Sequence, residues 1–179
     1  MPKWKLKLPM THLNITVLLF DAFSNMVLAC LLEPLRVVRD QHGLDISWTI
    51  LTQTDLPVES SSGIAVTPDK PKAQAKPAEL AFVIGGDVFR DTCSASDLRR
   101  SIDPLIANAT VIAADTGTWI LARCGYLEGR KATLHWQLLD EFAETFPQVD
   151  VSSDRVVRDG RFWTCGTAAA ALDLMLDYI

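Results

Sequence analysis

The stretch VIAADTGTWILARCGYLEGR, residues 111–130, joins a short apolar run to a segment with a helical pattern. The apolar run stops at Asp115, and a helix is expected over 116–125, closed by Gly125. A strand that turns sharply into a helix is a position at which enzymes mount a nucleophile. We call this strand–turn–helix junction the elbow. Its tip carries an aspartate.

On both sides of the elbow, apolar runs typical of buried strands alternate with segments of helical periodicity. Strands are predicted over 13–20, 46–53, 80–87 and 110–114, and helices over 24–42, 94–109, 116–125, 136–147 and 166–179. A hairpin is predicted over 149–165, because Asp159-Gly160 is a strong turn signal between two β-rich runs. This alternation predicts a three-layer α/β/α sandwich around a flavodoxin-like, mostly parallel sheet.

Several local features refine this expectation. Ser24 or Asn25 is expected to cap the first helix and Gly43 to stop it, while Pro34 is expected to kink or locally break it. Segment 58–70 is interpreted as a turn with a short extended piece, and 70–79 as a surface loop. Residues 127–136 are interpreted as a turn and a short strand that ends near His135. In the last helix, one face is expected to hold Leu172, Met175, Leu176 and Ile179.

The composition is that of one globular domain, with 179 residues, 49% of them hydrophobic and 22% charged. We place the domain at 13–179 and interpret 1–12 as an N-terminal leader. The formal net charge of −5, without a basic stripe, argues against nucleic-acid binding by this domain itself. No apolar run reaches the roughly 20 residues that span a bilayer, so no membrane role is expected.

The cysteine pattern indicates a reducing, cytoplasmic compartment. The four cysteines lie far apart, form no CxxC pair and have no histidine at metal-ligand spacing: Cys30, Cys93, Cys124 and Cys165. We therefore expect no disulfide framework, no metal site and no cofactor.

Candidate site residues follow from the sheet topology, because ligands of open α/β sheets gather outside the carboxyl ends of the strands. Those ends carry Gly85-Gly86-Asp87, Asp115 and His135. Each has a purely structural alternative: a turn for the glycines, a helix N-cap for Asp115, and a satisfied polar contact for His135. Glu33, in an otherwise apolar helix, faces either solvent or a pocket.

The chain resembles the class I glutamine-amidotransferase-like (ThiJ/PfpI) superfamily, and in particular the N-terminal domain of AraC-type transcription regulators built on that fold. The resemblance rests on LLFDAFSNMVLACLLEPLRVV, SSSGIAVTPD, FVIGGD, DTGTWILARCGYLEGRKATLHW, EFAETFPQVDVSSDRVVRDGRFWTC and AAALDLML, in the family's order over most of 13–179. The resemblance implies a helix-turn-helix domain beyond residue 179, through which alone DNA would be bound.

The resemblance also implies roles for single residues. Enzymatic members carry a cysteine nucleophile at the position of Asp115, a histidine at His135, and backbone donors at the position of Gly85-Gly86-Asp87. Glu33 falls on the helix that often carries a pocket glutamate. Relatives often have two glycines or Ser-Gly where this chain has Gly166-Thr167. A pocket that has lost its thiol implies a non-catalytic sensor domain.

We therefore expect a small metabolite as the ligand, an amino-acid-like or quaternary-ammonium zwitterion, and a homodimeric regulator. The expected ligand-binding residues are Glu33, Gly85, Gly86, Asp87, Asp115, Thr116 and His135, with an aromatic face from Trp119 or Trp136. The alternative is a hydrolase-type enzyme in which Asp115 is the nucleophile and His135 is the base that activates water.

Overall fold

The computed structural model describes residues 12–86 and 94–179 of the chain. Its centre is a six-stranded sheet in the order β2-β1-β5-β6-β10-β9. The first five strands in this order run parallel, and β9 pairs antiparallel with β10. The strands are β1 (His12–Leu19), β2 (Asp45–Thr52), β5 (Leu80–Ile84), β6 (Thr110–Ala114), β9 (Val156–Asp159) and β10 (Phe162–Cys165). The predicted mostly parallel sheet is confirmed.

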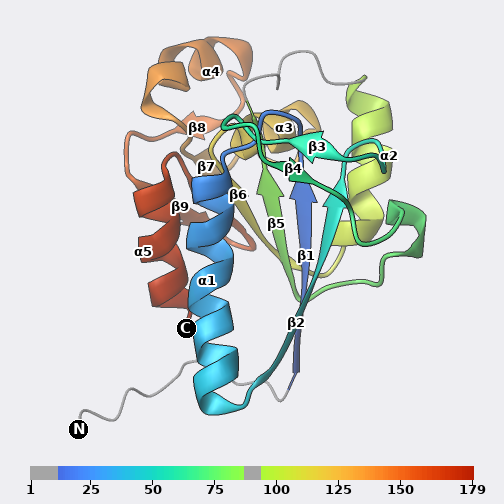
Figure 1. Ribbon diagram of the computed structural model, residues 1–179. Coiled ribbons are helices and arrows are strands. Elements are labelled where there is room, and N and C mark those ends of the chain that lie inside the picture. The colour runs from blue at the N-terminus through green and yellow to red at the C-terminus, as the bar shows by residue number, and fades with distance from the viewer. Residues whose placement is uncertain (1–11, 87–93) are drawn as a thin grey trace, which may run out of the picture.

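Helices cover both faces of this sheet and complete the three layers. On one face, α1 (Asn25–His42) and α5 (Ala168–Tyr178) pack side by side, and the opposite face is covered by α2 (Ala95–Ile106) and α3 (Gly117–Arg123) (Figure 1). Two apolar clusters fill the interfaces, because successive side chains of a strand point to opposite faces. In β1, for example, Val17 belongs to the cluster under α1 and α5, and Leu18 to the other cluster.

The first helix follows its predicted boundaries but not the predicted break. The Ser24 hydroxyl oxygen accepts the backbone N–H of Val27 at 3.3 Å, and Gly43 ends the helix with a φ of 64°. The helix runs without interruption through Pro34, so the expectation of a local break is wrong, while the alternative of a kink stays a prediction. A proline removes one intrahelical hydrogen bond, and the buried stripe of Val27, Leu31, Leu35 and Val38 holds the remaining turns on the sheet.

Smaller elements surround the carboxyl ends of the strands. They are the hairpin β3 (Val58–Glu59) and β4 (Ala65–Val66), the parallel pair β7 (Lys131–Ala132) and β8 (Asp150–Val151), the 3-10 turns η1 (Lys72–Gln74) and η3 (Trp136–Leu138), and α4 (Leu139–Thr145). The predicted strand before His135 therefore ends three residues earlier, at Ala132. The hairpin turn at Asp159-Gly160 is confirmed, with Gly160 at a φ of 57°.

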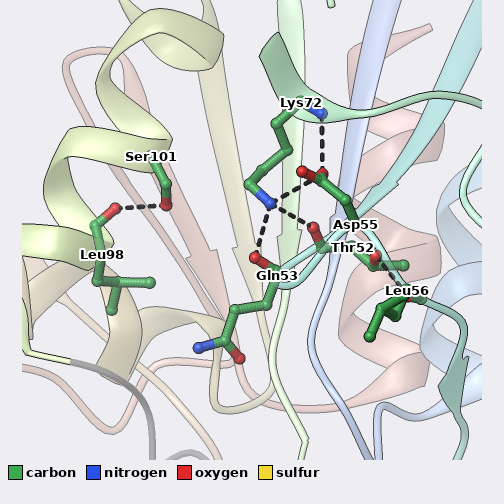
Figure 2. Close-up of polar contacts among 7 residues, drawn as sticks. All are labelled: Thr52, Gln53, Asp55, Leu56, Lys72, Leu98 and Ser101. Atoms are coloured by element: carbon green, nitrogen blue, oxygen red, sulfur yellow. Dashed lines mark hydrogen bonds and ion pairs between the residues drawn. The ribbon is translucent and has the colours of Figure 1, made fainter.

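The surface segment 70–79 is anchored by one lysine. The ammonium group of Lys72 donates to the carbonyl oxygens of Thr52 and Gln53, at 3.0 and 2.6 Å, and to the Asp55 carboxylate at 2.9 Å (Figure 2). Its side chain is only 13% exposed. Backbone carbonyls at the end of β2 are thereby satisfied by a cation, which fixes the loop that leads to the β3–β4 hairpin.

Candidate functional site

The elbow is a strained turn between β6 and α3. Asp115, the first residue after β6, has a φ of 56°. This left-handed conformation is uncommon for a residue other than glycine and costs an L-residue about 1–2 kcal/mol. The backbone N–H of Asp115 donates to the carbonyl oxygen of Cys165 at 2.9 Å, so the neighbouring strand β10 holds the turn in place. The half-buried Asp115 thus lies at the carboxyl edge of the sheet.

The predicted N-cap role of Asp115 is wrong. The N-cap position of α3 belongs to Thr116, one residue later, because the left-handed turn at Asp115 delays the start of the helix. The Thr116 side chain does not cap the helix either. Instead its buried hydroxyl donates to the carbonyl oxygen of Gly86 at 2.9 Å, which ties the elbow to the segment after β5.

The glycines after β5 make room for this turn. A Cβ atom on Gly85 would lie 2.3 Å from the Thr116 hydroxyl oxygen and 2.5 Å from the backbone nitrogen of Gly117. A Cβ atom on Gly86 would lie 2.1 Å from the carbonyl oxygen of Asp21. The close backbone approach that the Gly-Gly pair indicates is therefore made to the elbow and to the turn after β1. Asp87, the third residue of this predicted loop, lies outside the described residues.

His135 reaches the same edge of the sheet by way of Gly166. It is half-buried at the start of η3, with its ring centroid 5.9 Å from that of Trp136. A Cβ atom on Gly166 would lie 2.2 Å from the carbonyl oxygen of Leu134 and 2.9 Å from the backbone nitrogen of His135. The two-residue step Cys165–Gly166 therefore contacts Asp115 on one side and the backbone of His135 on the other.

Cys165 is a neighbour of the elbow that is not among the site residues expected from the sequence. Burial, and then the negative charge of Asp115, raise the pKa of the Cys165 thiol to about 12. The thiol is therefore protonated at neutral pH. The signal that could have found it is the adjacency of β6 and β10, which is a matter of strand order and not of sequence spacing.

Glu33 lies away from the elbow. It is eight residues into α1, about 12 Å along the helix axis from Asn25 at 1.5 Å per residue. Its side chain is 58% exposed and pairs with Arg36 at 2.8 Å, and a hydrogen bond from Arg36 lowers the pKa of the Glu33 carboxyl. Glu33 borders an apolar groove between α1 and α5 and does not line the cavity beside Trp136.

The two tryptophans considered for an aromatic face have different surroundings. Trp119 is 6% exposed and packs against Phe142 and Phe146 in the core, so it cannot face a ligand. Trp136 is 68% exposed beside His135 and borders a small cavity of about 180 Å³, which Gly166 and Thr167 also line. The hydroxyl oxygen of Thr167 accepts the backbone N–H of Ala170 and caps α5.

Two absences hold for the described parts of the chain. Within 12–86 and 94–179, no three His, Cys, Asp or Glu side chains group as metal ligands. Among the same residues, no helix is both long and apolar enough to cross a membrane.

The fold is a mostly parallel three-layer α/β sandwich with a strained strand–turn–helix elbow at the carboxyl edge of its sheet. This combination defines a class of proteins that includes both enzymes and regulatory domains. The family model of the DJ-1/PfpI family matches residues 14–179. The chain belongs to this family.

Proteins that are similar to the chain in sequence include transcriptional regulators and an enzyme. The HTH-type transcriptional regulators CdhR and GbdR of Pseudomonas aeruginosa are 36% and 31% identical to the chain, over 90% and 93% of its length. The matches cover 48% and 46% of these two proteins, so the chain spans about half the length of the curated relatives it matches first. Isonitrile hydratase of Pseudomonas putida is 29% identical over 74% of the chain and 58% of the enzyme.

A solved structure agrees with this fold. The crystal structure of an AraC family transcriptional regulator from Pseudomonas putida superposes with a TM-score of 0.79 at 20% identity, over 92% of this chain and 89% of that one. At this identity the likeness concerns the fold alone.

Proposed function

We propose that this chain is the small-metabolite-sensing domain of an AraC-type transcription regulator, and that its elbow binds the metabolite without transforming it. The observation that carries the proposal is the left-handed Asp115 at the tip of the elbow, where the resemblance would place a nucleophile. A carboxylate there supplies a fixed negative charge, whereas the neighbouring Cys165 thiol stays protonated. The similarity to named transcriptional regulators supports the regulatory role.

The ligand we propose is an amino-acid-like or quaternary-ammonium zwitterion. The carboxylate of Asp115 would attract its cationic end, and the exposed ring of Trp136 offers an aromatic face at the same edge of the sheet. Backbone N–H groups around Gly85 and Gly86 would receive its carboxylate, and Thr116 and His135 would line the space between.

The whole regulator would bind DNA through a helix-turn-helix domain beyond residue 179 and would act in the cytoplasm. It would act as a homodimer, because helix-turn-helix proteins read paired half-sites with two-fold symmetry. Metabolite binding at the elbow would change the conformation of this domain, and that change would be transmitted to the DNA-binding domain.

Titration calorimetry and thermal-shift screening with amino acids and quaternary ammonium compounds test the proposal. We expect saturable binding that Asp115→Asn, an isosteric and uncharged replacement, weakens at least tenfold. The matched control is Asp140→Asn, since Asp140 is an exposed aspartate on α4. The sensor role is rejected if no cationic metabolite binds, or if both variants bind as well as the natural chain.

A second candidate function is hydrolysis, favoured by the placement of Asp115 and the backbone of His135 on two sides of Cys165–Gly166. An Asp115 carboxylate oxygen would attack an electrophilic carbon of the substrate and form an ester as the leaving group departs. Water activated by His135 would then cleave the ester and regenerate the carboxylate. Intact-protein mass spectrometry after substrate trapping would reveal such an adduct on the natural chain and none on Asp115→Asn.

A further inference from the structure

The cavity of about 180 Å³ beside Trp136 lies where η3, the segment after β8 and the start of α5 meet. In Figure 1, β8, α4 and α5 lie on the same side of the molecule. The apolar part of the cavity lining comes from Leu134, Trp136 and Leu139. At about 30 Å³ for each water-sized group, the cavity holds about six non-hydrogen atoms, which is the size of a short side chain.

Thr133 supplies a buried hydroxyl group to this cavity. The residue is 2% exposed and lines the cavity. Its backbone is fixed on both sides, because its N–H donates to the hydroxyl oxygen of Thr164 at 2.9 Å and its carbonyl oxygen accepts the hydroxyl of Thr118 at 2.9 Å. The Thr133 hydroxyl itself has no hydrogen-bond partner among the described residues, in which every fully enclosed side-chain oxygen and nitrogen has one. It is therefore accessible from the cavity, and a ligand there would satisfy it.

Arg155 supplies positive charge to the same cavity. Its guanidinium pairs with Asp173 of α5 at 3.0 Å, and because a guanidinium has several N–H donors, some remain for a ligand. The other charged group of the lining is the Asp154 carboxylate, which already accepts from Lys131 at 2.9 Å and from the Ser152 hydroxyl at 2.7 Å. The donors that remain are a guanidinium and a hydroxyl, and together they suit an anion that accepts hydrogen bonds.

The cavity adjoins the cation site proposed at the elbow. Gly166, which lines the cavity, directly follows Cys165, whose carbonyl oxygen accepts the N–H of Asp115. Neighbouring strands lie about 5 Å apart, so the cavity begins about one strand spacing from Asp115. Trp136 borders the cavity and carries the aromatic face proposed for the cation. A group attached a few bonds away from the cation therefore reaches the cavity.

We propose that this cavity is the specificity subsite of the metabolite site, and that it takes a short side chain ending in a carboxylate. The inference rests on the sensor function proposed above and deepens it, because it makes the metabolite an acidic, amino-acid-like zwitterion. The methylene groups of its side chain would lie against Leu134 and Leu139. Its terminal carboxylate would accept hydrogen bonds from Arg155 and Thr133.

The lining distinguishes a carboxylate from other end groups of similar size. An ammonium group would meet the like charge of Arg155, and the Asp154 carboxylate is already paired with Lys131. An amide would fit the same volume but would accept with a neutral oxygen. Charge-assisted hydrogen bonds are roughly twice as strong as neutral ones, so the cavity should prefer the acid to the amide.

Titration calorimetry with matched amino acids tests this preference. L-Glutamate and L-aspartate should bind the 179-residue chain at least about tenfold more tightly than L-glutamine and L-asparagine, because only the acids form charge-assisted bonds with Arg155. Arg155→Gln should remove the preference. Arg158→Gln is the matched control, because Arg158 pairs with Asp177 of the same helix at 2.7 Å but does not line the cavity. This control should keep the preference.

Thr133→Val tests the second donor. It replaces the hydroxyl with a methyl group of similar size and should weaken the binding of L-glutamate several-fold. Circular dichroism melting curves show whether this buried replacement folds. Arg155→Gln changes a side chain that is 69% exposed, so the calorimetric test is decisive even where Thr133→Val does not fold.

Propionate separates this subsite from the sensor function, because it carries a carboxylate and no cation. In amide NMR spectra, propionate should shift the signals of the Trp136 indole and the Gly166 amide in the natural chain and in Asp115→Asn, but not in Arg155→Gln. Propionate binding without amino-acid binding would uphold the subsite and reject the sensor role. Cationic metabolites that bind without preference for the acids, or a preference that survives Arg155→Gln, would overturn the subsite and leave the sensor role intact. Absence of both kinds of binding overturns both.

Discussion

The backbone N–H of Asp115 donates to the carbonyl oxygen of Cys165 at 2.9 Å, and this bond joins the elbow to the end of β10. The next residue, Gly166, packs on the backbone of His135. Asp115 and His135, which are twenty residues apart in sequence, are thereby both contacted by Cys165 and Gly166 at the end of β10. The placement of Asp115 and His135 relative to each other depends on β10 as much as on the elbow itself.

The left-handed conformation of Asp115 predicts that function and stability are opposed at this residue. Asp115→Gly should raise the free energy of unfolding by about 0.5–1 kcal/mol, because glycine adopts a positive φ without strain. The same change should abolish metabolite binding. Urea denaturation and calorimetry measure the two effects.

Ala22 provides the control for this prediction, since it has a φ of 58° and no charged group. Ala22→Gly should give a similar gain in stability while metabolite binding is kept. A loss of stability in both variants would mean that the left-handed turns are not strained.

Gly166 is predicted to be the least replaceable residue of the pocket wall. Gly166→Ala places a methyl group 2.2 Å from the carbonyl oxygen of Leu134, so the segment before His135 must move. We expect a loss of about 1–3 kcal/mol in the free energy of unfolding and weaker metabolite binding. Gly129→Asn is the control, because that position has an open environment and a φ of 68° that asparagine tolerates. Its stability should change by less than about 1 kcal/mol.

The Cys165 thiol predicts a loss of stability at alkaline pH. Its pKa rises from the ordinary value of 9.0 to about 12 on folding, so above pH 9 the folded chain holds a proton that the unfolded chain releases. The free energy of unfolding should therefore fall as pH rises, by up to about 1.4 kcal/mol per pH unit. Denaturation between pH 9 and 10 measures the slope, to which the raised pKa values of Cys30, Tyr126 and Tyr178 also contribute, so the Cys165 share is the difference from a Cys165 variant. Cys165→Ala should reduce this slope, and an unchanged slope would contradict the assignment.

Much of the fold was predictable, because buried parallel strands and amphipathic helices have distinct apolar periods. The strands and the hairpin turn at Asp159-Gly160 are confirmed for this reason. The left-handed φ of Asp115 and the proximity of Cys165 were not predictable. They depend on strand order and on backbone contacts between segments far apart in sequence.

Lys72 is predicted to stabilise the fold without affecting recognition. Lys72→Met removes the donor to the carbonyl oxygens of Thr52 and Gln53 while keeping a similar volume. We expect a loss of about 1–3 kcal/mol in the free energy of unfolding, because those carbonyls lose a charged partner. Lys76→Met, at an exposed lysine of the same segment, should change stability little. Metabolite binding and the sedimentation coefficient should be unchanged in both variants, and weaker binding in Lys72→Met would extend the pocket to this loop.

The contrast between the two tryptophans gives the last prediction. Trp136→Ala should weaken the binding of a cationic metabolite several-fold, because it removes the exposed aromatic face beside His135. The free energy of unfolding of this variant should change by less than about 0.5 kcal/mol. Trp119→Ala should instead lower the free energy of unfolding by about 3–5 kcal/mol, since the Trp119 ring is packed against Phe142 and Phe146. Calorimetric titration and denaturation of the two variants separate the roles. Unweakened binding in Trp136→Ala would place the ligand away from this ring and leave Asp115 alone to recognise the cation.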